Sequence, residues 1–136
     1  MGTLERLQNS IFEFLRGIND LRFADIKKDT LRDLNGKAEG LRINIVSPLP
    51  KSASKYAAGP TFSEVEIAVE ISRDDNVAVR APSLLTSAEM VSRALHNWTP
   101  PVNCGFGRIS LAAQNPWEKS RPDKIKIIFN AQSILQ

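Results

Sequence analysis

The sequence contains a single cysteine, Cys104, and a single histidine, His96. One cysteine cannot form a disulfide within the chain, and a zinc site needs several thiolate or imidazole ligands at fixed spacing. A Cys–His nucleophilic pair would require these two side chains to meet across a turn, and their expected helix-end and loop positions need no such chemistry. We therefore expect Cys104 to be a small, half-buried apolar residue, and we expect no metal, no cofactor and no catalytic residue.

Long apolar runs are missing as well. No stretch approaches the roughly 20 apolar residues that a membrane span requires, and residues 1–9 are charged and polar where a signal peptide would be apolar. A strong charge of one sign is also missing, because 18 Lys and Arg against 15 Asp and Glu leave a net charge of +3, with the basic residues scattered. These absences predict an intracellular protein, or one released by lysis, with no membrane partner and no specific nucleic-acid partner.

A phosphate-binding glycine loop is absent too. Residues 105–107 have the pattern Gly-x-Gly, but they precede an expected strand instead of lying between a strand and a helix. They lack the helix N-terminus whose free N–H groups would hold a phosphate. A turn or bulge that leads into the strand is the better interpretation.

The residues that are present fit one globular domain. A length of 136 residues, with 42% hydrophobic and 24% charged residues, is typical of a single domain over 1–136. Apolar residues three and four positions apart between Leu4 and Ile18 predict an amphipathic helix. Thr86 and Glu89 match a capping box and predict the start of a second helix. The buried stripe of this second helix is expected to be Met90, Val91, Ala94, Leu95 and Trp98.

Strands are expected where apolar and polar residues alternate. The segments with this pattern are 21–26, 41–45, 64–71, 108–113 and 124–131. Between them we expect a short helix over 29–34, a long surface loop over 47–61 and a hairpin loop over 114–123. These elements predict an α+β fold, with a mainly antiparallel sheet of about four to five strands and two main helices packed on one face.

The polar side of the expected sheet is rich in charge. Its charged residues are Arg42, Glu64, Glu66, Glu70, Arg108, Lys124 and Lys126. A hydrolase that uses Glu66 and Glu70 is one interpretation, but paired catalytic carboxylates need a concave, partly desolvated pocket that a flat strand does not provide. Cross-strand ion pairs and subunit contacts explain the charges better.

Two further features suggest contacts with other subunits. The loop over 47–61 carries Lys51, Lys55 and Tyr56 and is either an arm that grips a neighbouring subunit or a mobile loop without a role. Trp117 lies in a proline-flanked segment, where an interface anchor and local packing are equally good interpretations.

Several segments together resemble a known family. They are residues 23–26, 40–48, 59–62, 66–71 and 94–100, followed by an antiparallel strand pair. In element order and turn placement the chain, from about residue 18 to residue 131, is similar to the tail terminator and tail-completion (neck) proteins of long-tailed bacteriophages and prophages.

This resemblance implies an α+β subunit that forms a hexameric ring, caps the growing tail tube, ends its polymerisation and offers a surface to head-completion proteins. It implies no metal or cofactor, and it places the protein in the virion after assembly in the host bacterial cytoplasm. The expected partners are copies of the chain itself, tail-tube proteins and head-completion proteins. The alternative from another class is a small ligand- or nucleotide-binding regulatory α+β domain.

The residues expected at protein contacts combine the charged face, the loop and the tryptophan. They are Arg42, Lys51, Lys55, Tyr56, Glu64, Glu66, Glu70, Arg108, Trp117, Lys124 and Lys126.

Overall fold

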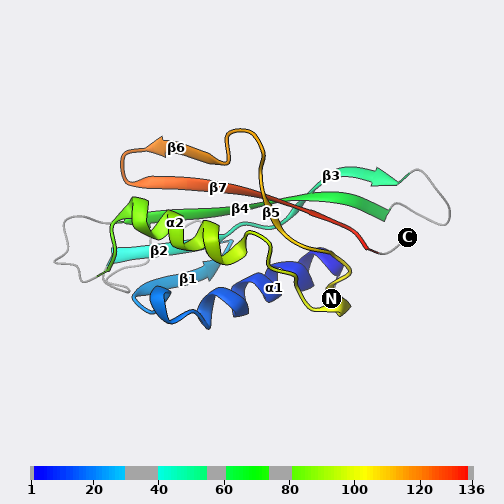
Figure 1. The fold of residues 1–136 in the computed structure, drawn as a ribbon, viewed down its shortest axis with the longest axis horizontal. Coiled ribbons are helices and arrows are strands. Elements are labelled where there is room, and N and C mark those ends of the chain that lie inside the picture. Colours follow the sequence, from blue (N-terminus) through cyan, green and yellow to red (C-terminus); the bar gives the residue numbers. More distant parts are fainter. Residues whose placement is uncertain (1, 30–39, 55–60, 74–80, 135–136) are drawn as a thin grey trace.

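The computed structural model of the chain describes residues 2–29, 40–54, 61–73 and 81–134. These residues form an α+β fold with two α-helices and one mixed, mostly antiparallel sheet, as the sequence predicts (Figure 1). In chain order the elements are α1 (Thr3–Arg16), the short 3-10 helix η1 (Asn19–Leu21), β1 (Ala24–Lys28), β2 (Leu41–Ile45), β3 (Leu49–Ser54), β4 (Thr61–Arg73), α2 (Leu84–Leu95), the 3-10 helix η3 (Val102–Cys104), β5 (Ser110–Leu111), β6 (Trp117–Arg121) and β7 (Lys124–Gln132).

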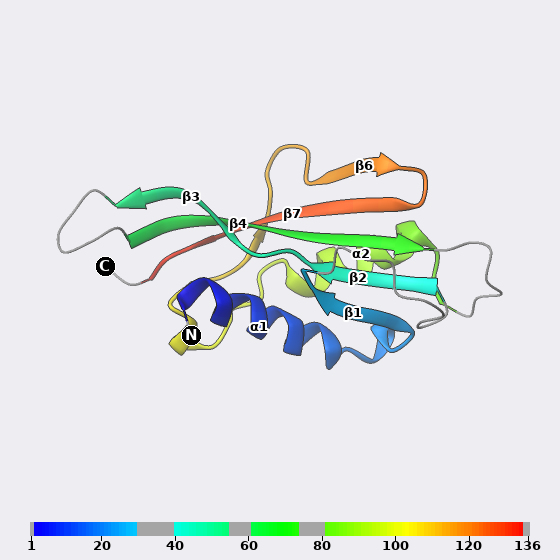
Figure 2. The same ribbon diagram turned by 180° about the vertical axis from the view of Figure 1, so that it is seen from behind.

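The two longest strands, β4 and β7, form the centre of the sheet. They pair antiparallel from Glu64 opposite Gln132 to Ser72 opposite Lys124. The free edge of β4 is shared by β2 and β3, and the free edge of β7 is shared by β5 and β6. β1 extends the sheet by pairing parallel to β2. β4 and β7 cross each other in projection in Figures 1 and 2, which reflects the right-handed twist of the sheet.

Both helices pack on the same side of the sheet and close a single hydrophobic core. Leu7, Ile11 and Leu15 of α1 are fully buried, as are Val91 and Leu95 of α2. Alternate residues of the strands meet them, and those that are buried are Leu41, Ile43, Ile45, Val65, Ile67, Val69, Ile71, Ile125, Ile127, Phe129 and Ala131. Each such side chain contributes about 1.5–3 kcal/mol on burial, so this layer is the main source of stability. No helix in the described ranges is long and apolar enough to cross a membrane.

Two predicted loops are partly strands. The segment 49–54 lies inside the predicted loop over 47–61, but it forms β3 and pairs with the N-terminal half of β4. The segment 117–121 lies inside the predicted loop over 114–123, but it forms β6 and pairs with β7. Both are short, polar edge strands whose order comes from the long strand beside them, and such strands carry little alternation of their own. Residues 55–60 lie outside the described part of the chain.

Other predicted boundaries move by a few residues. The strand predicted over 21–26 begins at Ala24, because η1 precedes it. The strand predicted over 108–113 is paired regularly only at 110–111. The short helix predicted over 29–34 falls, beyond its first residue, outside the described part of the chain.

The predicted capping box of the second helix is wrong. Ser83 is the N-cap of α2, and its hydroxyl accepts a hydrogen bond of 3.2 Å from the Thr86 N–H. Thr86 therefore lies inside the first turn, because Ser83 offers an equivalent oxygen one turn earlier. The buried stripe shifts accordingly: Ser87, Ala88, Val91, Ser92 and Leu95 are buried, whereas Met90, Ala94 and Trp98 are half-buried.

Asp29 fastens α1 to the ends of β1 and β2. Its carboxylate accepts hydrogen bonds from the Gln8 side chain at 2.7 Å and from both the N–H and the hydroxyl of Ser47. The backbone of Asp29 is in the left-handed region, with φ of 50°. Burial alone would raise the pKa of Asp29, but the hydrogen bonds from Ser47 and Gln8, together with the charge of Lys28, outweigh burial and lower the pKa.

We predict that Asp29→Asn destabilises the fold at neutral pH. The loss is about 1 kcal/mol, since the carboxylate is largely exposed and solvent screens its contacts. Because the pKa of Asp29 is lowered in the folded state, its contribution is present above the unfolded pKa and is lost as the pH falls through the folded pKa. Urea unfolding of the two proteins across this range should give curves that converge in acid, and a constant difference would contradict the assignment.

Candidate protein-interaction surface

The side of the sheet opposite the helices is formed by the outward residues of β2, β4 and β7. In Figure 2, α2 lies behind these strands, so this side faces the viewer there. Its members are Arg42, Asn44, Glu64, Glu66, Ala68, Glu70, Ser72, Lys124, Lys126, Ile128 and Asn130, and we call them the outer face. All are half-buried except Ala68, which is buried by its larger neighbours.

Strand register arranges the outer face in rows across the sheet. Glu70 lies opposite Lys126 on one side and opposite Asn44 on the other. The Glu70 carboxylate accepts a hydrogen bond of 3.1 Å from the Asn44 amide and lies 3.0 Å from Lys124 Nζ. The structure thus contains the cross-strand ion pair that the sequence predicts, worth about 0.2–1 kcal/mol in its partly exposed position.

An apolar row lies beside the charged row, and the sequence interpretation missed it. Ala68 is opposite Ile128 in the pairing of β4 with β7. Val46 donates its N–H to the Ala68 carbonyl at 3.0 Å, and Ala112 donates its N–H to the Ile128 carbonyl at 2.9 Å, so these two residues extend the row. The signal was present in the sequence, because Ala68 and Ile128 interrupt the polar half of each alternation.

Some predicted contact residues surround a polar hollow at one end of the outer face. Glu64 and Arg108 line this hollow of about 440 Å³ together with Ser110, Asn130 and Gln132. Lys51 lies close by on β3, 3.8 Å from the Glu64 carboxylate, and belongs to a paired strand instead of a free arm. Lys55 and Tyr56 lie outside the described residues.

The distance between Glu66 and Glu70 tests the hypothesis that these two carboxylates form a hydrolase site. Glu66 and Glu70 are four residues apart on the same strand, which separates their backbones by roughly 13 Å. Glycosidases hold their two carboxyl groups about 5–10 Å apart. Glu66 also lies opposite Asn130, and Glu70 opposite Lys126, so the two occupy different rows. This arrangement disfavours a paired-carboxylate site.

Trp117 packs within its own chain. Its side chain is half-buried against the core, and its indole N–H donates a hydrogen bond of 2.9 Å to the Ser92 hydroxyl of α2. Local packing, one of the two sequence interpretations, therefore accounts for its position. A contact of Trp117 with another subunit stays a prediction.

Cys104 and His96 lie in different surroundings. Cys104 is 2% exposed, more buried than predicted, and its Sγ lies 2.9 Å from the Ser10 hydroxyl of α1. His96 Nδ1 accepts a hydrogen bond of 3.0 Å from the Leu111 N–H at β5. Gly105 has φ of 79° and forms the predicted turn after η3. Within the described ranges, no three His, Cys, Asp or Glu residues lie close enough to hold a metal.

The helix side carries an aromatic contact that the sequence did not reveal. Trp98 was predicted to be core, but it is half-buried and stacks on Phe14, with ring centroids 4.3 Å apart. The two rings, with Asn9, Glu13 and Pro101 among their neighbours, line an open surface hollow of about 450 Å³. The periodicity of apolar residues assigns each ring to its own segment, but it does not predict that the two rings stack.

We predict that Glu70→Ala costs about 0.5–1 kcal/mol of unfolding free energy, because it removes the Lys124 ion pair and the Asn44 hydrogen bond. Glu66→Ala on the same strand is the matched control and should cost less. Urea unfolding at low and high salt measures both, and the Glu70→Ala loss should shrink in high salt. Equal losses for the two variants at both salt concentrations would show that the row contributes nothing specific.

The chain matches no protein-family model and no curated protein.

Proposed function

We propose that the chain is a structural protein of a bacteriophage or prophage, a tail terminator that assembles with copies of itself into a ring. The ring caps the tail tube, ends tail polymerisation and joins the tail to the head. In this role the chain carries out no chemical reaction and needs no cofactor. It assembles in the cytoplasm of the host bacterium and ends in the virion.

The observation that carries the proposal is the outer face. It presents ordered rows of balanced charge with one apolar row among them, on the side of the sheet away from both described helices. Surfaces of this mixed character suit association between proteins, since charge complementarity sets the register and apolar contact adds affinity. A subunit that must recognise both its own copies and a tail tube needs such a surface.

The segments that carry the family resemblance fall on ordered elements. Residues 40–48 contain β2, residues 66–71 lie in β4, and residues 94–100 include the end of α2. The resemblance implies an α+β subunit, and the fold class agrees with it. This agreement supports the proposal at the level of architecture, while the ring and its six-fold symmetry rest on the resemblance alone.

We predict that the purified protein stops elongation of the tail-tube protein encoded nearest to its own gene. Added during tube assembly, it should give tubes of limited length with a ring at one end in electron micrographs. Tubes that grow to the same length with and without the protein would refute the proposal.

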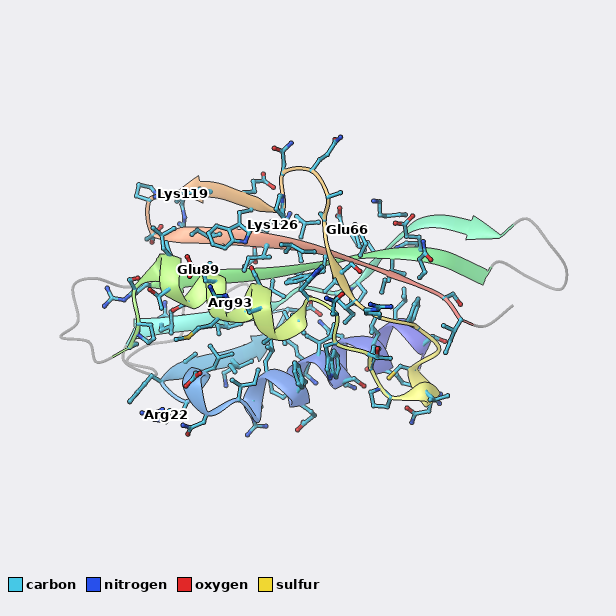
Figure 3. The ribbon with its side chains drawn as sticks, viewed as in Figure 1. Arg22, Glu66, Glu89, Arg93, Lys119 and Lys126 are labelled. Carbon is cyan, nitrogen blue, oxygen red and sulfur yellow. The ribbon has the colours of Figure 1, made fainter. Side chains whose placement is uncertain are left out.

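A matched pair of variants tests whether the outer face takes part. Glu66 lies on the outer face and Glu89 lies on the exposed side of α2, so the same charge reversal can be placed on opposite sides of the molecule (Figure 3). Glu66→Lys should weaken tube capping, whereas Glu89→Lys should leave it unchanged. Equal activity of the two variants would remove the outer face from the capping surface.

The second candidate function is binding of a small anionic ligand, and the polar hollow favours it. Arg108 offers a permanent positive charge there, and Asn130 and Gln132 offer amide donors. Glu64 also lines the hollow, and Lys51, 3.8 Å away, offsets the charge of its carboxylate. A nucleotide that binds only the folded state raises the free energy of unfolding, by about 2.7 kcal/mol when its concentration is a hundred times its Kd. The midpoint temperature of thermal unfolding rises as a result. Thermal shift with a nucleotide panel, repeated on Arg108→Gln, separates this function from the first.

A further inference from the structure

The outer face is complementary to itself in charge. Its β4 column contains Glu64, Glu66 and Glu70, and its β7 column contains Lys124 and Lys126. The β4 column is therefore acidic and the β7 column beside it is basic to neutral. In register, Glu70 is opposite Lys126, whereas Glu66 and Glu64 are opposite the amides Asn130 and Gln132. A second copy can be turned by 180° about a line that lies just above the outer face, over the space between β4 and β7 and parallel to the strands. This places the β4 column of each copy over the β7 column of the other, so that Glu70 faces Lys126 twice and Glu66 and Glu64 face the amides Asn130 and Gln132.

The outer face is also complementary to itself in size. Ala68 and Ile128 are opposite each other in the centre of the apolar row. The same rotation sets the short Ala68 side chain of one copy against the longer Ile128 side chain of the other, on both sides of the axis. Alternation of small and large residues across two facing sheets gives close packing without voids.

A two-fold axis that runs across the strands would not bring opposite charges together. A two-fold axis across the strands, through the apolar row, would place Glu66 of one copy over Glu70 of the other, with like charges near the centre. Charges of one sign that face each other across an interface oppose association. The charge pattern therefore selects the axis along the strands.

The outer parts of the face are compatible with this axis. Asn44 of one copy comes to face Glu118 of the other, as an amide donor and a carboxylate. Arg42 of one copy faces Arg121 of the other, and this contact between like charges is offset because each arginine has an acidic neighbour in its own chain. Asp25 is opposite Arg42 in register, and Asp123 lies 3.5 Å from Arg121.

Pairing through the sheet edges is less favourable than pairing through the face. In the described part of the chain, the strands β1, β3, β5 and β6 pair on one side only. β1 ends in the exposed residues Lys27 and Lys28, and β5 is only two residues long. β3 contains Pro50 and two register shifts, and β6 has a register shift between Glu118 and Arg121. Proline, bulges and charge on edge strands oppose addition of a further strand.

We propose that two copies of this chain associate outer face to outer face about a two-fold axis. The axis lies in the interface between the two sheets, over the space between β4 and β7, and runs parallel to these strands. The contact pairs Glu70 of each copy with Lys126 of the other and Ala68 with Ile128. It goes beyond the proposed function, because a two-fold contact uses the same surface twice, whereas a ring needs two different surfaces. A dimer formed in this way covers the face that is proposed to contact the tail tube, so the two contacts exclude each other on one copy. The association of the free protein is therefore measured without tail tubes, and tube capping is measured separately.

The test uses two charge variants, alone and mixed. Glu70→Lys makes both facing positions basic, and Lys126→Glu makes both acidic, so each variant alone should associate at least about ten-fold more weakly than the unmodified chain. When the two are mixed, both contacts pair a lysine with a glutamate, and association should return as a dimer with one copy of each. Sedimentation velocity with one variant fluorescently labelled measures all three samples.

The results with the two charge variants distinguish the axis along the strands from the axis across them. Any change within each chain is the same alone and in the mixture, so recovery on mixing can come only from contact between copies. Stronger association of Glu70→Lys alone would favour the axis across the strands and overturn the proposal. An unmodified chain that is monomeric at every concentration, or a mixture that stays monomeric, would overturn it as well.

A second pair of variants covers the case in which a charge variant fails to fold. Ala68→Arg places a long charged side chain in the apolar row of the outer face, and Leu85→Arg makes a similar change at a position of α2 that is 59% exposed. Circular dichroism checks that both are folded. Ala68→Arg should abolish dimers and Leu85→Arg should retain them, and equal behaviour of the two would refute the contact.

Discussion

The antiparallel pairing of β4 with β7 sets the positions of the other strands and of the residues on both sides of the sheet. Their register is continuous from Glu64 to Ser72, and every second pair in it is buried under the helices. A slip of one residue would turn the buried side chains outward and the charged ones inward, so the hydrophobic core fixes the register. The shorter strands then attach to the outer edges of this pair, and their positions follow from it.

The same register organises both sides of the sheet. Core packing specifies only the inward residues, which leaves the outward residues free to carry another pattern. On β4 that pattern is acidic with Ala68 at its centre, and on β7 it is basic to neutral with Ile128 at its centre. Core packing fixes the register, and the register then fixes which outward residues of β4 and β7 are opposite each other.

Elements with a strong burial pattern could be predicted from the sequence, and elements without one could not. α1, β2, β4 and β7 bury alternate or helically spaced apolar residues, and their positions agree with the predictions within a few residues. β3 and β6 contain Lys51 and Lys119 and obtain their order by pairing with the long strand that follows each of them, so their own residues carry no burial pattern. Likewise, two serine or threonine residues three positions apart, Ser83 and Thr86, can each begin a helix, and only tertiary packing selects the first.

The charged residues of the outer face could be predicted from the sequence, but their pairing could not. The sequence identifies which outward residues are charged, but it does not say which of them are opposite each other, because that depends on the register of pairing between distant strands. Glu70 and Lys124 could thus be assigned to one face but not to one ion pair. The contribution of Trp117 to the local packing depends on Ser92, a residue that the helix pattern gave no reason to notice.

The central position of β7 has a consequence for how the chain folds during synthesis. β7 is the last strand in the described chain, yet it pairs with β4, β5 and β6. Until it leaves the ribosome, the long inner edge of β4 has no partner, and the apolar side of the sheet is only half assembled. Completion of the fold therefore waits until β7 has been synthesised and has left the ribosome, and before that point the nascent chain is most exposed to aggregation and to chaperones.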